Sequence, residues 1–207
     1  MRIVAMSDTH NLHRSVSVPD GDVLVHAGDL TNRGDLADVA DFNAWLGDLP
    51  HRHKLVIAGN HDFCFERTPR EAKALLTAAT YLLDSGVTID GVHFYGSPWQ
   101  PWFFDWAFNL PRGGALAAKW ALIPPQTDVL ITHTPPQGIG DVTAVENEAV
   151  GCEALRPVVA ALAPRLHVFG HIHEGYGVVE KAGVIYANAS VVTLDYRPVN
   201  PPLIFDL

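Results

Sequence analysis

The sequence is poor in features that mark secreted and membrane proteins. It has only two cysteines, Cys64 and Cys152, and their spacing suits neither a disulfide framework nor paired thiolate ligands. It contains no apolar run of the roughly 18–20 residues that a membrane-spanning helix needs. The first eight residues turn polar too soon for a signal peptide. We therefore expect two reduced thiols, no membrane association and a cytoplasmic location.

Basic residues are also scarce. The chain has 14 lysines and arginines against 23 aspartates and glutamates, which gives a formal net charge of −9. Such a surface repels a polyanion, so broad binding to the nucleic-acid backbone is disfavoured. A local metal site can still attract a single phosphate group, because a bound cation dominates the field around it.

Apolar residues, by contrast, make up 48% of the 207 residues, enough to bury a sizeable core. Short apolar runs predict strands at residues 3–7, 22–26, 53–58, 81–83, 88–89, 92–95, 128–132, 166–169, 176–180, 184–187 and 203–205. Helical spacing predicts helices at 35–46, 70–79, 114–122 and 152–163. Strands and helices alternate first and hairpins follow, without repeats or a long linker. The pattern favours a single α/β domain with mixed sheets over residues 1–207.

Five of the predicted strands end in metal-ligand side chains. In order, these groups are Asp8 and His10, then Asp29, then Asn60 and His61, then His133, then His171 and His173. In open α/β sheets, sites form beyond the carboxyl ends of the strands. Five groups that are far apart in the sequence can therefore meet in one pocket.

The types of ligand indicate the metal chemistry. Imidazole suits zinc, iron and nickel, whereas carboxylate and amide oxygens suit manganese and magnesium. A carboxylate can bridge two ions, and Asp29 is the natural candidate. Two ions about 3.5–4 Å apart can clamp the attacking and leaving oxygens of an in-line displacement, with a hydroxide held by them as the nucleophile.

Each of these residues taken alone also has an ordinary structural explanation. Asp8 can cap a loop, Asp29 can be a turn residue, Asn60 can occupy a left-handed turn and His133 can be a buried, hydrogen-bonded histidine. Together they favour a metal site, because five separate strand ends carry ligand types in order.

This arrangement resembles the calcineurin-like metallophosphoesterase superfamily, whose motifs run D-x-H, G-D, G-N-H-[DE], H and G-H-x-H. Every motif is present between Asp8 and His173. Longer phrases at residues 26–31, 96–101, 106–109 and 170–177 resemble the metallophosphoesterase-domain-containing branch, which is related to class III cyclic nucleotide phosphodiesterases. Some relatives in that branch lack the first histidine of the last motif, which this chain keeps as His171. The implied fold is a four-layer α/β/β/α sandwich of two mixed sheets flanked by helices.

The resemblance also implies roles for the residues. One metal is expected on Asp8, His10, Asp29 and His173, and the other on Asp29, Asn60, His133 and His171. His61 is expected beside the leaving group, as an acid or a phosphate-stabilising group, with Asp62 to orient it. The cofactors implied are two divalent ions: manganese first, with iron, zinc, nickel, cobalt or magnesium as alternatives.

Other residues carry weaker signals. Aromatic side chains crowd residues 99–108, where they can stack on a nucleobase or pack as core and lid. Asn32, Arg33 and Arg112 can contact phosphate or lie in solvated loops. His26 is expected to be a core residue or to support the ligands, and the histidines at 51, 53, 93 and 167 are expected to be structural.

The first functional hypothesis is a metal-dependent phosphodiesterase acting on a cyclic nucleotide or a similar small diester. The alternatives are a phosphomonoesterase for a nucleotide or phosphoprotein, and a nucleotide-binding or scaffold protein with a residual metal site. The expected partner is a small phosphate ester, most naturally a nucleotide. The oligomeric state is left open.

Overall fold

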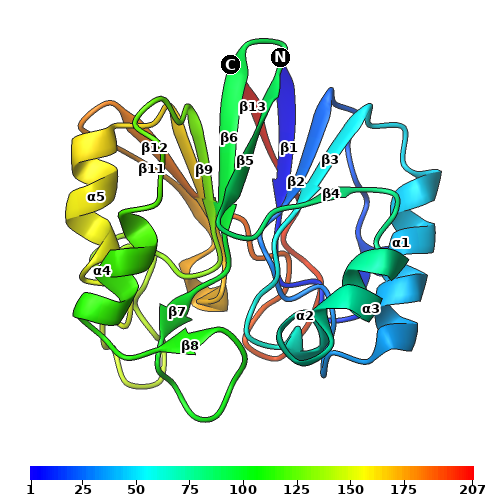
Figure 1. The fold of residues 1–207 in the computed structure, drawn as a ribbon, viewed down its shortest axis with the longest axis horizontal. Coiled ribbons are helices and arrows are strands. Elements are labelled where there is room, and N and C mark those ends of the chain that lie inside the picture. The colour runs from blue at the N-terminus through cyan, green and yellow to red at the C-terminus, as the bar shows by residue number, and fades with distance from the viewer.

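Two β-sheets lie at the centre of the molecule, with helices on their outer sides (Figure 1). A computed structural model describes all 207 residues. The first sheet has the order β13-β1-β2-β3-β4. Its strands are β1 (Arg2–Met6), β2 (Val23–His26), β3 (His53–Val56), β4 (Thr80–Tyr81) and β13 (Leu203–Asp206). The first four run parallel, and β13 pairs antiparallel with β1.

The second sheet has the order β11-β12-β10-β9-β6-β5. Its strands are β5 (Ser85–Ile89), β6 (Val92–Ser97), β9 (Val129–Thr132), β10 (Leu166–Phe169), β11 (Gly177–Lys181) and β12 (Val184–Asn188). The inner strands are parallel, and each edge strand is antiparallel to its neighbour. Both sheets are therefore mixed, as predicted.

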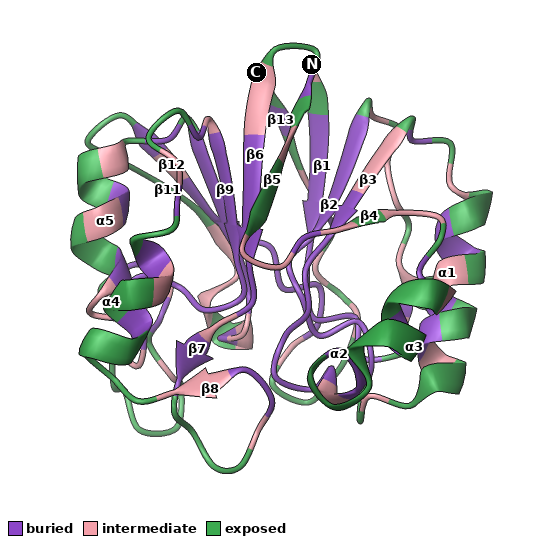
Figure 2. Ribbon diagram, in the orientation of Figure 1, coloured by how far each residue is buried: buried purple, intermediate pink, exposed green.

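The alternation of side chains along each strand builds the layers. On β1, Ile3 and Ala5 face the second sheet and join a core cluster with Val129 and Ile131 of β9. The intervening Val4 faces the helices on the other side. Because both faces are covered, the central strands are buried and mostly apolar, with His26, Thr132 and His167 as the polar exceptions; Figure 2 shows these strands as purple ribbons.

Helices cover the outer face of each sheet (Figure 1). On the first sheet lie α1 (Leu36–Asp48), α2 (Phe63–Arg67) and α3 (Pro69–Leu75), and on the second lie α4 (Gly114–Trp120) and α5 (Leu155–Leu162). The α/β/β/α sandwich is thereby confirmed. No helix is long and apolar enough to cross a membrane.

The structure differs from the predicted elements mainly near the loops. The helix α2 follows Asp62 directly and was not predicted, because five residues are too few for a helical repeat to be recognised. Helix α3 ends at Leu75, short of the predicted residue 79, because the chain turns to enter β4. A small parallel pair, β7 (Gln100–Pro101) and β8 (Asn109–Leu110), closes the aromatic segment.

Candidate metal centre

The five predicted groups lie in loops at the carboxyl ends of β1, β2, β3, β9 and β10. In Figure 1 these loops lie at the end of the sheets opposite the two chain termini. Three of the ligand candidates, Asp8, Asp29 and His133, are almost completely buried, with 0–2% of their surface exposed. The sheets therefore bring together residues up to 165 positions apart, Asp8 and His173 (173 − 8 = 165).

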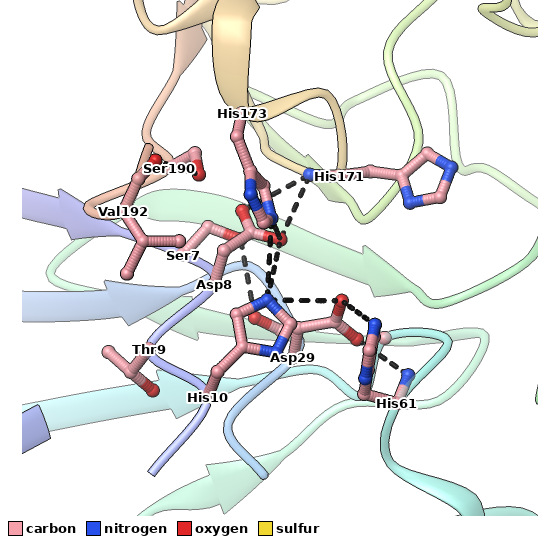
Figure 3. Close-up of polar contacts among 12 residues, drawn as sticks. Ser7, Asp8, Thr9, His10, Asp29, His61, His171, His173, Ser190 and Val192 are labelled. Atoms are coloured by element: carbon pink, nitrogen blue, oxygen red, sulfur yellow. Dashed lines mark hydrogen bonds and ion pairs between the residues drawn. The ribbon is translucent and has the colours of Figure 1, made fainter. Parts of the chain in front are cut away.

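One group of donor atoms forms around Asp8. Nε2 of His173 lies 3.5 Å from Oδ1 of Asp8, and Nε2 of His10 lies 4.0 Å from the same oxygen. The two Nε2 atoms are 3.3 Å apart. Figure 3 shows these atoms facing one another across a small gap. These three residues can hold one metal ion.

A second group forms around Asp29. Its Oδ2 lies 3.4 Å from Nε2 of His133, 3.7 Å from Nε2 of His10 and 4.0 Å from Nε2 of His61. Asn60 joins this group, because its Oδ1 lies 2.9 Å from Nε2 of His133. Asp29 thus lies between the groups, as a bridging carboxylate would.

His171 approaches the centre differently from the other candidates. Its backbone N–H donates to both carboxylate oxygens of Asp8, at 3.1 and 3.2 Å. Its ring points away from Asp8 in Figure 3 and lies 5.0 Å from the ring of His133. The structure therefore places His171 beside the second group but outside the sets of donor atoms that face one another.

Backbone carbonyls fix which nitrogen of three of the histidines faces the centre. Nδ1 of His133 donates to Ala27 O at 2.9 Å, and Nδ1 of His61 donates to Asn32 O at 2.8 Å. Nδ1 of His173 donates to Thr193 O at 3.2 Å. A proton committed to Nδ1 leaves Nε2 with its lone pair toward the site.

The backbone at the site adopts an uncommon conformation. Asp8, His10, Asp29 and His171 all have left-handed backbones, with φ between 42° and 68°. Such positions are strained for residues other than glycine, and strain of this kind clusters at functional sites. At Gly59, a Cβ atom would overlap the carboxylate of Asp29, so only glycine lets the two loops approach.

Charge coupling sets the pKa values. Burial alone would raise the pKa of Asp8 and Asp29, but the neighbouring histidines hold both well below the usual range. Burial lowers the pKa of His10 to about 4 and that of His171 to about 3. For His133 burial acts in the same direction, yet the charge and hydrogen bond of Asp29 raise its pKa to about 9. The buried carboxylates therefore stay ionised and attract positive charge.

The arrangement fits divalent metal ions. Because His133 donates through Nδ1, its neutral form turns a lone pair toward Oδ1 of Asn60 only 2.9 Å away. Two acceptors at this distance repel unless a proton or a cation lies with them. The Nε2 atoms of His10 and His173, 3.3 Å apart, likewise share either a proton or a cation. Mixed nitrogen and oxygen donors match a first-row transition metal.

Asp62 does not contact the His61 ring, which corrects the expectation that it orients that side chain. Its carboxylate accepts hydrogen bonds from the backbone of Gly59, Leu30 and Thr31 and from the hydroxyl of Thr31. The carbonyl of Asn32 holds the ring instead. Asp62 ties the loop after β2 to the loop after β3, and burial followed by the charge of Asp29 raises its pKa to about 6.

The weaker candidates separate into two sets. Trp106 contacts the site, with its ring centroid 4.2 Å from that of His61. Trp99 instead packs on Phe108, and Phe103 packs on Phe104. Arg112 hydrogen-bonds to the backbone of residues 150 and 151 and to Glu153, away from the ligands.

The histidines without motif context mostly make structural contacts. His26 is buried, and its Nε2 lies 3.0 Å from the hydroxyl of Thr9. Thr9 lies between the ligand candidates Asp8 and His10 in the sequence. His51 bonds to Pro19 O, His93 to Asp128 and His167 to Thr132. These contacts agree with the expectation of structural or supporting roles.

Comparison with known proteins places the chain among metal-dependent phosphoesterases. The model of the calcineurin-like phosphoesterase family matches residues 1–175, and the chain belongs to this family. It is 49% identical over 230 aligned positions to human metallophosphoesterase domain-containing protein 1, an alignment that covers all of this chain and 71% of the human protein.

Two solved structures share the fold. One is a protein from Thermus thermophilus, with a TM-score of 0.60, 16% identity and coverage of 90% of this chain and 88% of that one. The other is described as an archaeal phosphodiesterase, with a TM-score of 0.51, 15% identity and full coverage of both chains.

Proposed function

We propose that this protein is a dinuclear metal-dependent phosphodiesterase that hydrolyses a small diester, such as a cyclic nucleotide. Asp8, His10, Asp29 and His173 would hold one ion, and Asp29, Asn60, His133 and His171 the other. Manganese is the expected metal. Family membership supports phosphoester hydrolysis in general, and the diester preference rests on the charges at the site.

The observation that carries the diester preference is the scarcity of fixed positive charge. No lysine or arginine forms a hydrogen bond or an ion pair with any of the proposed ligands, with His61 or with Asp62. A phosphodiester carries one negative charge, whereas a monoester near neutral pH approaches two. Two metal ions and a histidine suit the smaller charge.

The protein's own residues would position the reaction and move one proton. The metal ions, when bound, supply Lewis acidity and a nucleophile at neutral pH. Nδ1 of His61 donates to Asn32 O, and its Nε2 faces the centre, 4.0 Å from Oδ2 of Asp29. With a proton on Nε2 as well, the ring would donate to the leaving oxygen or hydrogen-bond the phosphate.

The test compares substrates side by side at saturating manganese. Adenosine 2′,3′-cyclic, 3′,5′-cyclic and 5′-monophosphates are assayed for kcat/KM, with Asp29→Asn as a control for contaminating hydrolases. We expect at least one cyclic diester to be turned over faster than the monophosphate. Faster turnover of the monophosphate would replace the proposal with a phosphomonoesterase. Binding without any turnover would favour a nucleotide-binding protein.

We also propose a reducing, cytoplasmic location. Both cysteines are free and buried, and burial raises the pKa of each thiol. Such thiols are inert toward oxidation and need no partner. Fractionation of the native cells, followed by detection of the protein, tests this directly.

A further inference from the structure

A tyrosine outside the predicted motifs lies against the metal-ligand candidates. The ring centroid of Tyr196 is 4.8 Å from that of His10 and 5.5 Å from that of His173. It lies 6.5 Å from the ring of His61. The side chain nevertheless remains 42% exposed. Tyr196 therefore contacts both the ligand cluster and solvent.

A rigid turn holds Tyr196 in this position. Tyr196 N donates to Thr193 O at 2.9 Å, and Thr193 N donates to Arg197 O at 3.0 Å. Thr193 O also accepts the Nδ1 proton of His173. The same turn thus orients a proposed metal ligand and presents the tyrosine ring.

The backbone of Tyr196 is itself unusual, with φ at +55°. A bulky aromatic residue in this conformation is an outlier, and strain of this kind persists where the surrounding structure enforces it. The turn lies beyond residues 1–175, the part matched by the family model.

The geometry of the ring suits a flat ligand. All three aromatic contacts of Tyr196 are edge-to-face, with interplanar angles of 71°, 75° and 90°, so no parallel ring covers either face. The other exposed aromatic side chains lack this placement. Phe103 and Phe104 pair with each other, and Trp102 has no aromatic contact with a site residue. Aromatic rings bind nucleobases by parallel stacking, whatever the base.

We propose that Tyr196 is a specificity-determining residue that stacks on the planar base of a nucleotide ester bound at the metal centre. This inference rests on the proposed function only in requiring that the site bind a phosphate ester. It predicts a preference for phosphates that carry a base over the same sugar phosphates without one.

The experiment measures that preference by binding, independently of turnover. Calorimetry gives the Kd of adenosine 5′-monophosphate and of ribose 5-phosphate for the manganese-loaded protein and three variants. Tyr196→Leu removes the aromatic ring and keeps apolar bulk, and Tyr196→Phe removes only the hydroxyl. Phe104→Leu is the matched control, because it removes an exposed ring that touches no site residue.

We expect Tyr196→Leu to weaken the nucleotide by about 5- to 150-fold while leaving ribose 5-phosphate unchanged, since stacking is worth about 1–3 kcal/mol per base. Tyr196→Phe and Phe104→Leu should keep the wild-type ratio. Two results would overturn the inference. One is an unchanged Kd for the nucleotide in Tyr196→Leu, and the other is an equal loss for both ligands, which would mark the ring as mere support for His10 and His173.

Turnover adds a second comparison. Adenosine 2′,3′-cyclic phosphate and methyl ribofuranoside 2′,3′-cyclic phosphate share the reacting group and differ in the base. Tyr196→Leu should lower kcat/KM for the first alone. If the wild-type protein hydrolyses neither of these diesters nor adenosine 3′,5′-cyclic phosphate, the phosphodiesterase proposal fails, and the ratio of the two Kd values still decides the role of Tyr196.

Discussion

Replacing Thr31 by valine tests whether Asp62 is a clamp between loops. Thr31 is completely buried, and its hydroxyl donates to Oδ1 of Asp62 at 2.8 Å while accepting from Gly34 N at 2.9 Å. Valine has nearly the same shape and makes neither bond. The change therefore removes two hydrogen bonds with little loss of packing.

The expected cost follows from the two bonds. A hydrogen bond to a charged group contributes about 1.5–3 kcal/mol, and the half-buried amide of Gly34 loses its acceptor at a cost of about 1 kcal/mol. The free energy of unfolding should fall by about 2.5–4 kcal/mol. A domain is stable by about 5–15 kcal/mol, so the variant should still fold.

Denaturant unfolding of the metal-free protein measures the loss, and Thr127→Val provides the matched control. Thr127 is also buried, but its hydroxyl makes one neutral bond, to Pro124 O at 2.8 Å. That variant should lose only about 0.5–1.5 kcal/mol. If Thr31→Val costs no more than Thr127→Val, the carboxylate of Asp62 does not clamp the loops and the argument fails.

Further predictions concern the metal centre. Asp29→Asn should lower the manganese content measured by elemental analysis and abolish turnover, because its carboxylate lies between both donor groups; normal activity would refute the bridging role. His61→Gln should keep both metal ions and lose about 10²–10⁴-fold in kcat, more for poor leaving groups, whereas loss of metal would make His61 a ligand. The metal-free protein should lose stability as pH rises from about 6.5 through about 9. The pKa of His133 is raised to about 9 in the folded protein, against an ordinary value of 6.5. The protonated His133 therefore stabilises the fold fully only below pH 6.5, and this stabilisation is lost as the pH passes 9. Manganese should bind more tightly as the pH rises over the same range, because it displaces the proton of His133. Denaturant titrations at pH 6.5 and 9.5, with and without EDTA, measure both effects. Higher stability of the metal-free protein at pH 9.5, or weaker stabilisation by manganese there, would contradict the reasoning.

The sequence predicts well which residues gather at the site, because these residues follow the ends of predicted strands. Apolar runs locate β1, β2, β3, β9 and β10, and the structure places the polar groups that follow them at one end of the two sheets. The layers follow from the family resemblance and not from the strand patterns, because the central strands carry apolar side chains on both faces and show no polar alternation. Short helices such as α2 cannot be predicted in this way, because they depend on the loop that precedes them.

The sequence does not reveal which backbone groups orient the histidine rings. The carbonyls of Ala27, Asn32 and Thr193 select the free nitrogen of His133, His61 and His173. Every residue carries a carbonyl, so no side-chain pattern reveals which one points at a ring. The sequence does not predict Tyr196 as a site residue either, because a lone tyrosine in a polar loop belongs to no motif. Only the fold brings its ring to His10.

The contacts of Asp62 differ from those that its place in the motif suggests. Its position directly after His61 suggests a carboxylate–histidine pair, yet the chain turns into α2 at Asp62, and the carboxylate reaches back to the backbone at residues 30, 31 and 59. It still influences His61, because Thr31 precedes Asn32, whose carbonyl holds the ring. The influence passes through the backbone, so Asp62 would preserve the geometry of the centre without entering the proton transfer. A variant that loosens this clamp should therefore lower kcat without shifting the pH at which half of the activity is lost, whereas a carboxylate paired directly with His61 would shift that pH.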